Sequence, residues 1–162
     1  QKIKLLMNEL NIDENFLKVV EVSKKASEKK KTNVIALELP KGKIITGKQT
    51  DLLSPASSVI INAIKELSKI PDEINLLSPT ILEPILKLRK NNNTLSLQEV
   101  LIALAVCSVT NPSIASALEK LEVLKDCEAH ATYIVTNGDL KALKSLKINL
   151  TCEPNFYSKE IM

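Results

Sequence analysis

The stretch that decides the fold is NVIALELPKGKIITGKQTDLLSPASS, residues 33–58. Its first half holds two runs of β-forming residues, 33–39 and 43–47, which Pro40-Lys41-Gly42 separates. Two such runs around a short turn are typical of a β-hairpin. The second half contains Ser54-Pro55, a capping residue followed by a first-turn proline, which favours the start of a helix. We therefore expect a hairpin that leads into a helix.

The same stretch contains the spacing G-x-x-x-x-G-K from Gly42 to Lys48, which is most of the signature of a phosphate-binding loop. Such a loop needs a strand that ends at its first glycine and a helix that starts at its lysine. Here residues 44–46 are β-branched and favour a rigid strand. Gln49 also occupies the position of the magnesium-binding hydroxyl. The sequence therefore predicts extended backbone and not a nucleotide loop.

A weaker anion site remains open at the start of the following helix. Small residues at a helix N-terminus let an anion approach free backbone N–H groups. The candidate residues for binding a phosphate or carboxylate are Thr46, Gly47, Lys48, Thr50, Ser54 and Ser57. The alternative is that Ser54 only caps the helix while Lys48 lies in solvent.

Helix starts recur along the chain. Ser78-Pro79 and Asn111-Pro112 repeat the pairing of a cap with a proline, and Ser96–Glu99 has the spacing of a capping box. The capping box predicts a central helix that buries Val100, Leu101, Leu104 and Ala105. Pro84 should kink or restart the helix in which it lies.

The two ends of the chain supply the remaining elements. Amphipathic patterns predict a helix over residues 3–10 and a second one that begins after Asp13. Residues 130–136, 139–146 and 148–152 read as a strand, a short helix and a strand. This order predicts a small β-α-β unit with parallel strands.

The expected fold class is α/β, with α+β as the alternative. The hairpin and the β-α-β unit should form a small mixed sheet of about four strands, packed with six to seven helices. A chain of 162 residues fits a single domain, 1–162, with a real core. Two Tyr, two Phe and no Trp leave aliphatic side chains to fill that core.

Composition argues against several classes of function. A net charge of +3 and the few aromatic residues give no footprint for nucleic acid. The longest apolar stretch, residues 100–109, is too short to cross a bilayer. Three widely spaced cysteines indicate a reducing compartment and not a disulfide framework. We expect a cytoplasmic protein that contacts neither nucleic acid nor membrane.

Several residues with titratable or nucleophilic side chains lie near the C-terminus. His130 is the only histidine and therefore the only candidate of its type for an acid or base. The other members of this polar cluster are Cys127, Glu128, Thr132, Cys152 and Glu153. In parallel strands, Cys127 and His130 would lie roughly 16 Å from Cys152, too far to share a zinc ion. We predict no metal site and no cofactor in this chain.

Five blocks of the sequence together resemble one bacterial family. They are LPKGKIITGKQTDLLSPASSVIINAIKEL (39–67), LLSPTILEPILKL (76–88), EVLIALAVCSVTNP (99–112), CEAHATYIV (127–135) and INLTCEP (148–154). In this order they are similar to the C-terminal part of the family known as domain of unknown function 1846. The resemblance implies that the chain is the C-terminal part of a longer protein, whose preceding region carries a nucleotide-loop-like segment absent here.

The chain departs from the family pattern at several positions. Asp126 and Lys147 stand where the resemblance implies glycine, and Ala131 stands where it implies serine. Ser96 and Gln98 replace an expected His and Asp. Most of the polar positions discussed above are kept, together with Thr151.

Three functions remain open at this point. The first is an accessory domain of a cytosolic bacterial protein. This domain would contribute to a ligand site or a subunit contact, and Lys48 and His130 would be its polar residues closest to the ligand. Its partners would be the N-terminal region of the full-length protein, a small anionic ligand or a second copy. The second is an enzyme that acts on a phosphorylated or carboxylated small molecule, with His130 as acid or base. The third is a structural dimerisation module. A cleft shared by Lys48 and His130 would favour the enzyme, whereas opposite faces would argue against it.

Overall fold

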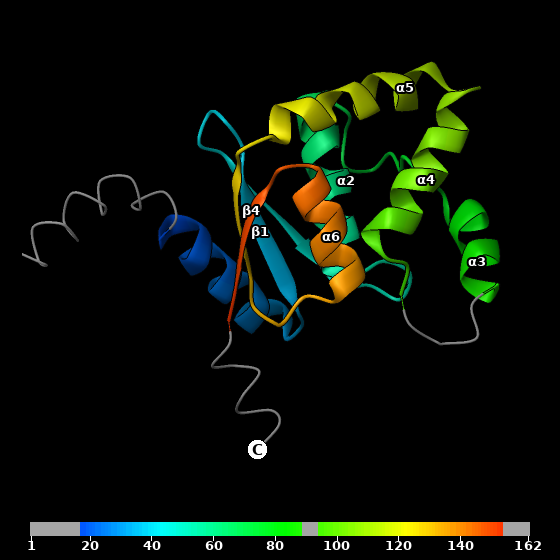
Figure 1. Cartoon of the computed structure of the whole chain (residues 1–162). Coiled ribbons are helices and arrows are strands. Elements are labelled where there is room, and N and C mark those ends of the chain that lie inside the picture. Colours follow the sequence, from blue (N-terminus) through cyan, green and yellow to red (C-terminus); the bar gives the residue numbers. More distant parts are fainter. Residues whose placement is uncertain (1–16, 89–93, 154–162) are drawn as a thin grey trace, which may run out of the picture.

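The computed structural model describes residues 17–88 and 94–153 (Figure 1). The helix expected over residues 3–10 and the cap expected at Asp13 lie outside these residues. A helix occupies residues 17–30 and precedes the hairpin. None of the helices within the described ranges is long and apolar enough to span a membrane.

The hairpin is confirmed. Strands β1 (Val34–Glu38) and β2 (Ile44–Lys48) pair antiparallel. At the turn, the Leu39 N–H donates to the Lys43 carbonyl at 2.8 Å, and Gly42 has φ of 92°, a conformation that favours glycine. Residues 44–46 are therefore extended backbone, as their side chains predict.

The C-terminal β-α-β unit completes a mixed sheet. Strands β3 (Glu128–Ala131) and β4 (Asn149–Cys152) pair in parallel, and β3 also pairs antiparallel with β1. The sheet order is β2-β1-β3-β4. The four-stranded mixed sheet packed with helices confirms the α/β class.

The prediction that β3 spans residues 130–136 is wrong, since the strand starts earlier and is shorter. It begins just after Asp126, whose N–H donates to the Lys147 carbonyl at 2.8 Å. Beyond the strand, the Thr132 hydroxyl oxygen accepts a hydrogen bond from the Val34 N–H at 3.0 Å. The next residues leave the sheet and lead to the N-cap Thr136 of the following helix.

Two positions where the resemblance implied glycine have left-handed backbone. Asp126 has φ of 67° and Lys147 has φ of 61°. Lys147 follows the C-cap of the last helix, where its N–H donates to Lys144 and the next N–H donates to Leu143. This pair of bonds is a Schellman motif, which usually places glycine at the position of Lys147. Glycine fits both sites because it adopts positive φ without strain.

The helix starts at Ser54, Ser78, Ser96 and Asn111 are confirmed as N-caps. The helical elements after the hairpin are α2 (Pro55–Leu67), α3 (Pro79–Lys87), α4 (Leu97–Ser108), α5 (Pro112–Glu119), the 3₁₀ helix η1 (Lys120–Leu124) and α6 (Asn137–Ser145).

Two details of the helix predictions are wrong. Of the kink or restart expected at Pro84, the restart is wrong: helix α3 runs through this residue, and proline leaves the carbonyl of exposed Thr80 without its helical partner. Helix α4 is not fully central: Val100 and Leu104 are buried, but Ala105 is exposed. Val106 on the same helix is 67% exposed.

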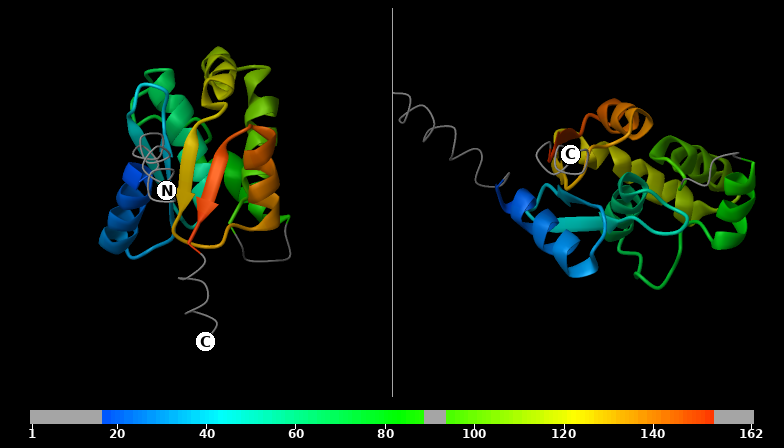
Figure 2. Two further views of the ribbon diagram at one scale, coloured as in Figure 1. Left: turned by 60° about the vertical axis from the view of Figure 1, so that its left-hand side comes forward. Right: turned by 90° about the horizontal axis from the view of Figure 1, so that it is seen from below.

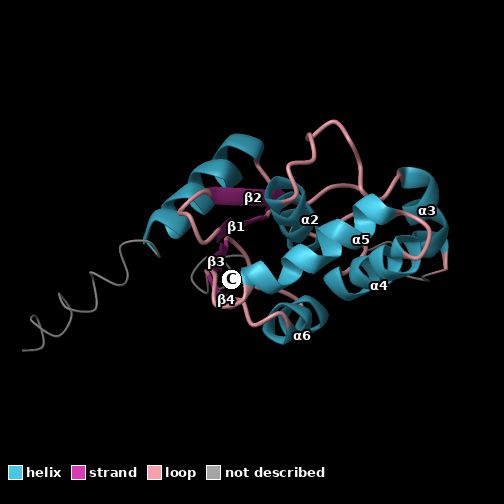
Figure 3. Cartoon of the chain, turned by 90° about the horizontal axis from the view of Figure 1, so that it is seen from above, coloured by secondary structure: helices cyan, strands magenta, loops and turns pink. Residues whose placement is uncertain are grey.

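The two faces of the sheet have different covers (Figures 2 and 3). Residues that pair across strands place their side chains on one face, so Ile35, Leu37, Ala129 and Ala131 share the apolar face. This face packs against α2 and the helices that follow it, and forms the core. The helix of residues 17–30 lies against the opposite face (Figure 1).

That opposite face, here called the polar face, collects most of the polar side chains of the sheet. By register, its residues are Val34, Ala36 and Glu38 on β1; Ile44, Thr46 and Lys48 on β2; Glu128, His130 and Thr132 on and after β3; and Asn149, Thr151 and Glu153 on and after β4. Seven of the polar positions that match the family pattern therefore lie on this face: Thr46, Lys48, Glu128, His130, Thr132, Thr151 and Glu153.

Candidate functional site

The glycine of the loop-like motif has a packing role. An ideal Cβ built on Gly47 would lie 2.1 Å from the Val59 backbone N and 2.5 Å from its Cα. Only glycine allows β2 to approach α2 so closely. Helix α2 begins at Pro55 and not at Lys48. The G-x-x-x-x-G-K spacing therefore belongs to a hairpin that is fitted against a helix.

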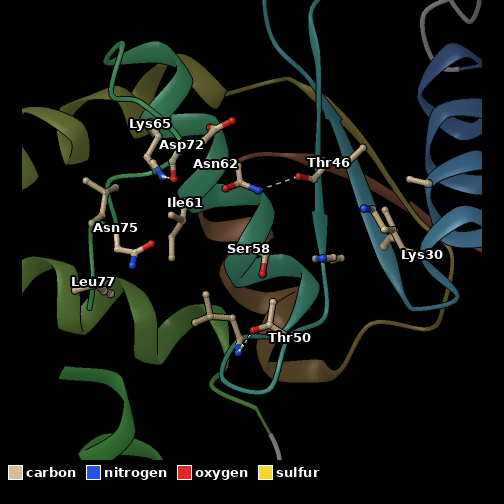
Figure 4. Close-up of a pocket in the computed structure, with 15 residues that line it drawn as sticks. Lys30, Thr46, Thr50, Ser58, Ile61, Asn62, Lys65, Asp72, Asn75 and Leu77 are labelled. Carbon is tan, nitrogen blue, oxygen red and sulfur yellow. Dashed lines mark hydrogen bonds between the residues drawn. The ribbon is translucent and has the colours of Figure 1, made fainter. Parts of the chain in front are cut away.

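A pocket of about 440 Å³ opens at the free edge of β2. It lies along α2, with β2 and the helix of residues 17–30 on one side and residues 72–77 on the other (Figure 4). We call it the edge pocket. Its polar lining consists of Lys30, Thr46, Lys48, Thr50, Ser58, Asn62, Lys65, Asp72 and Asn75.

Three lysines and one aspartate are the charged residues in the described lining of the edge pocket. Lys65 is only 5% exposed, and its Nζ donates to the backbone carbonyl of Asp72 at 2.9 Å. Lys30 and Lys48 are exposed, and no ion pair within the described residues involves either of them. The lining therefore carries an excess of positive charge.

Ser58 is a buried polar residue of the described pocket wall whose hydroxyl lacks a hydrogen bond. It is 7% exposed, and its Oγ has no partner within the part of the chain that the structure describes. The neighbouring Asn62 side chain donates to the Thr46 carbonyl at 3.0 Å. Thr50 Oγ1 accepts a hydrogen bond from the Leu53 N–H at 2.9 Å.

The six residues expected to bind an anion do not stay together. Thr46, Lys48 and Thr50 line the edge pocket. Ser54 caps α2 by accepting from the Ser57 N–H at 3.3 Å, while the Ser57 hydroxyl donates to the Leu95 carbonyl at 3.1 Å. Both serines thus have structural bonds at the start of α2.

Sequence reasoning missed the contribution of α2 to the pocket. Ser58, Asn62 and Lys65 recur at spacings of four and three, which places them on one side of the helix. This polar stripe on an otherwise apolar helix was the available signal. Lys30, from the lysine-rich end of the helix of residues 17–30, was missed as well.

His130 belongs to a separate network on the polar face. It is 4% exposed; its Nδ1 lies 2.7 Å from Thr151 Oγ1 and its Nε2 lies 3.2 Å from Glu153 Oε1. Lys24 Nζ also lies 3.2 Å from Glu153 Oε1, which links the network to the helix of residues 17–30. Burial raises the pKa of the Glu153 carboxyl, but its hydrogen bonds with His130 and Lys24 and their charges lower the pKa below its ordinary value.

Lys48 and His130 share the polar face but not a cleft. They lie on β2 and β3, two strands apart, which is about 10 Å across a sheet. Lys48 lines the edge pocket, whereas His130 is absent from its described lining. The arrangement therefore gives no support to an acid or base at the edge pocket.

The other members of the C-terminal polar cluster are dispersed. Glu128 and Thr132 lie on the polar face, whereas Cys152 pairs with Ala131 and lies on the apolar face. Cys127 precedes β3, and burial of its thiol, more than the nearby carboxylates, raises its pKa.

The distance expected between His130 and Cys152 is wrong. Because β3 starts earlier than predicted, His130 pairs with Thr151, next to Cys152 in the chain. The two side chains instead point to opposite faces. Within residues 17–88 and 94–153, no three His, Cys, Asp or Glu side chains form a group that could hold a metal ion.

Comparison with known proteins places the chain in a family. The family model described as "Domain of unknown function DUF1846, C-terminal" matches residues 15–162. The chain belongs to this family. It is 40% identical over 171 residues to the UPF0371 protein of Clostridium tetani (strain Massachusetts / E88) and 44% identical over 171 residues to a UPF0371 protein of Clostridium botulinum (strain Eklund 17B / Type B). Both alignments cover 98% of this chain but 34% of the relative, so the chain spans about a third of the length of these relatives.

Proposed function

We propose that this domain binds a small anionic ligand in the edge pocket, as an accessory domain of a longer bacterial protein. The observation that carries the proposal is the Ser58 hydroxyl, which is buried in the pocket wall without a hydrogen-bond partner among the described residues. Buried polar groups are nearly always paired, and an unpaired one costs about 1–3 kcal/mol. A ligand oxygen would supply the partner once the Ser58 side chain turns toward the pocket, since its Oγ is buried as it stands.

The charges of the pocket favour an anion. Lys65 is buried with one backbone carbonyl as its described partner, and a buried ammonium group is costly unless a negative charge compensates it. Lys30 and Lys48 add positive charge at the same pocket, against the single carboxylate of Asp72. A bound anion would therefore gain from all three lysines.

The accessory role is supported by the length of the relatives. Their further two thirds leave room for a region that could carry the main activity and contact this domain. The sequence supports a cytoplasmic location through its three cysteines, none of which forms a disulfide.

The proposal is tested by titrating the ¹⁵N-labelled protein with potassium phosphate, sulfate and acetate and following the amide shifts. We expect saturable shifts near Thr46, Ser58 and Asn62. The matched pair of variants is Ser58→Ala and Ser68→Ala, since the Ser68 hydroxyl is also buried without a described partner but lies outside the pocket lining.

Both substitutions remove an unpaired hydroxyl, so neither should lower the free energy of unfolding appreciably. Ser58→Ala should weaken anion binding by about tenfold, the worth of one hydrogen bond to a charged group. Ser68→Ala should leave it unchanged. Absence of saturable shifts with every anion would refute the proposal, as would equal binding by the two variants.

A further inference from the structure

We infer that the ligand of the edge pocket is a phosphate monoester with an apolar organic part. This inference rests on the proposed function and specifies the class of its ligand. It combines three properties of the pocket: its balance of charge, the hydrogen-bond donors left over in its wall, and an apolar surface that a bare inorganic ion would not use.

The charge balance favours a dianion. Lys30, Lys48 and Lys65 outnumber the one carboxylate of Asp72 in the described lining. A carboxylate ligand brings one negative charge, whereas a phosphate monoester brings between 1.5 and 2 near pH 7, because its second pKa is about 6. The phosphate therefore compensates more of the positive charge than a carboxylate does.

The free donors also favour phosphate. An ammonium group has three N–H donors, and Lys65 uses one of them for the Asp72 carbonyl. Two donors of Lys65 remain for a ligand, while Ser58 lies about two helical turns, roughly 10 Å, away along α2. A phosphate monoester offers three terminal oxygens as acceptors, enough to accept both of these Lys65 donors, while its ester-linked part extends along α2 toward Ser58.

The remaining wall of the pocket is apolar. Ile61 on α2 and Leu77 in the segment after it line the same pocket as Ser58 (Figure 4). Leu53, Leu76 and Val34 also contribute to the lining. A volume of about 440 Å³ lies in the range of sites for organic ligands, about 300–1,000 Å³, and exceeds what one inorganic ion fills. The organic part of the ligand would pack against these aliphatic side chains.

Calorimetric titration with four small probes tests the inference. The probes are phenyl phosphate, inorganic phosphate, benzoate and phenol, all at pH 7.5. Phenyl phosphate should bind at least about tenfold more tightly than inorganic phosphate, which lacks the apolar part, and at least about tenfold more tightly than benzoate, which lacks the second charge. Phenol, which has no charge at this pH, should bind most weakly.

The outcomes separate this inference from the proposed function. If benzoate binds as tightly as phenyl phosphate, or inorganic phosphate does, the ligand class is wrong while anion binding stands. If none of the anionic probes binds, both fail. Affinity for phenyl phosphate should fall as the pH is lowered from 7.5 to 5, since its second negative charge is lost near pH 6.

A pair of lysine variants locates the site. Lys48→Met removes a charge from the pocket, whereas Lys141→Met removes one from an exposed position on α6, outside the pocket lining. Both residues are exposed, so both variants should fold. Lys48→Met should weaken phenyl phosphate binding about three- to tenfold and reduce its dependence on salt, and Lys141→Met should not. Equal effects of the two variants would overturn the assignment to the edge pocket.

Discussion

Substitution of Gly47 by alanine tests whether β2 is a strand pressed against α2. The new Cβ would lie 2.1 Å from the Val59 backbone N, whereas ordinary contact requires at least 3.4 Å. Strand and helix would have to separate by about 1.3 Å, the difference of these distances. Shortening the Val59 side chain cannot relieve this clash, because its two closest atoms belong to the backbone.

We expect Gly47→Ala to lower the free energy of unfolding by about 3 kcal/mol, at the upper end of the cost of overpacking. In a chain of this size, that loss corresponds to a decrease in Tm of roughly 6–12 °C. Thermal and urea unfolding followed by circular dichroism would measure both quantities.

The other two glycines of the chain are natural controls. Gly42 has open space around its Cβ position but φ of 92°, so alanine should cost about 1–2 kcal/mol through backbone strain alone. Gly138 lies in α6 with open space and ordinary φ, so alanine should be neutral or stabilising by up to about 1 kcal/mol. The reasoning is refuted if Gly47→Ala is as stable as Gly138→Ala.

Two further predictions concern backbone strain and pH. Asp126→Gly and Lys147→Gly should each raise the free energy of unfolding by about 0.5–1 kcal/mol in urea unfolding, because both residues have positive φ; a decrease in both would contradict the strain argument. Glu153→Gln should lower this free energy by about 0.5–1 kcal/mol at pH 7, where Glu153 is ionised and paired with His130 and Lys24. The folded pKa of Glu153 is depressed, so the loss in free energy of unfolding should be complete above the unfolded pKa of this carboxyl and should vanish as the pH falls through its folded pKa. A loss that persists in acid would contradict the role of the ionised carboxylate.

The sequence predicted those parts of the fold that depend on only a few neighbouring residues, such as helix starts. Ser54-Pro55 and Asn111-Pro112 marked helix starts correctly, because a cap and a first-turn proline need no tertiary context. The extent of β3 was missed because apolar and β-branched residues continue to Val135, whereas the strand is defined by its pairing with the distant strands β1 and β4. Long-range pairing of this kind leaves little trace in a single sequence.

The site was predicted only in part for a similar reason. Thr46 and Lys48 were found because they stand next to a recognisable motif. Ser58 and Lys65 were missed because α2 reads as a buried helix, and only the neighbouring β2 edge shows which of its sides opens to a pocket. Ser54 and Ser57 were included because helix-start serines look alike whether they cap or bind.

The helix of residues 17–30 also determines where this domain can be truncated. It covers the polar face of the sheet, where the inner strand β1 carries Val34 and Ala36, which are 1% and 0% exposed. A fragment that started at the hairpin would open these aliphatic side chains to water and break the contact between Lys24 and Glu153. Such a shortened fragment would be prone to aggregate, so expression boundaries belong upstream of residue 17.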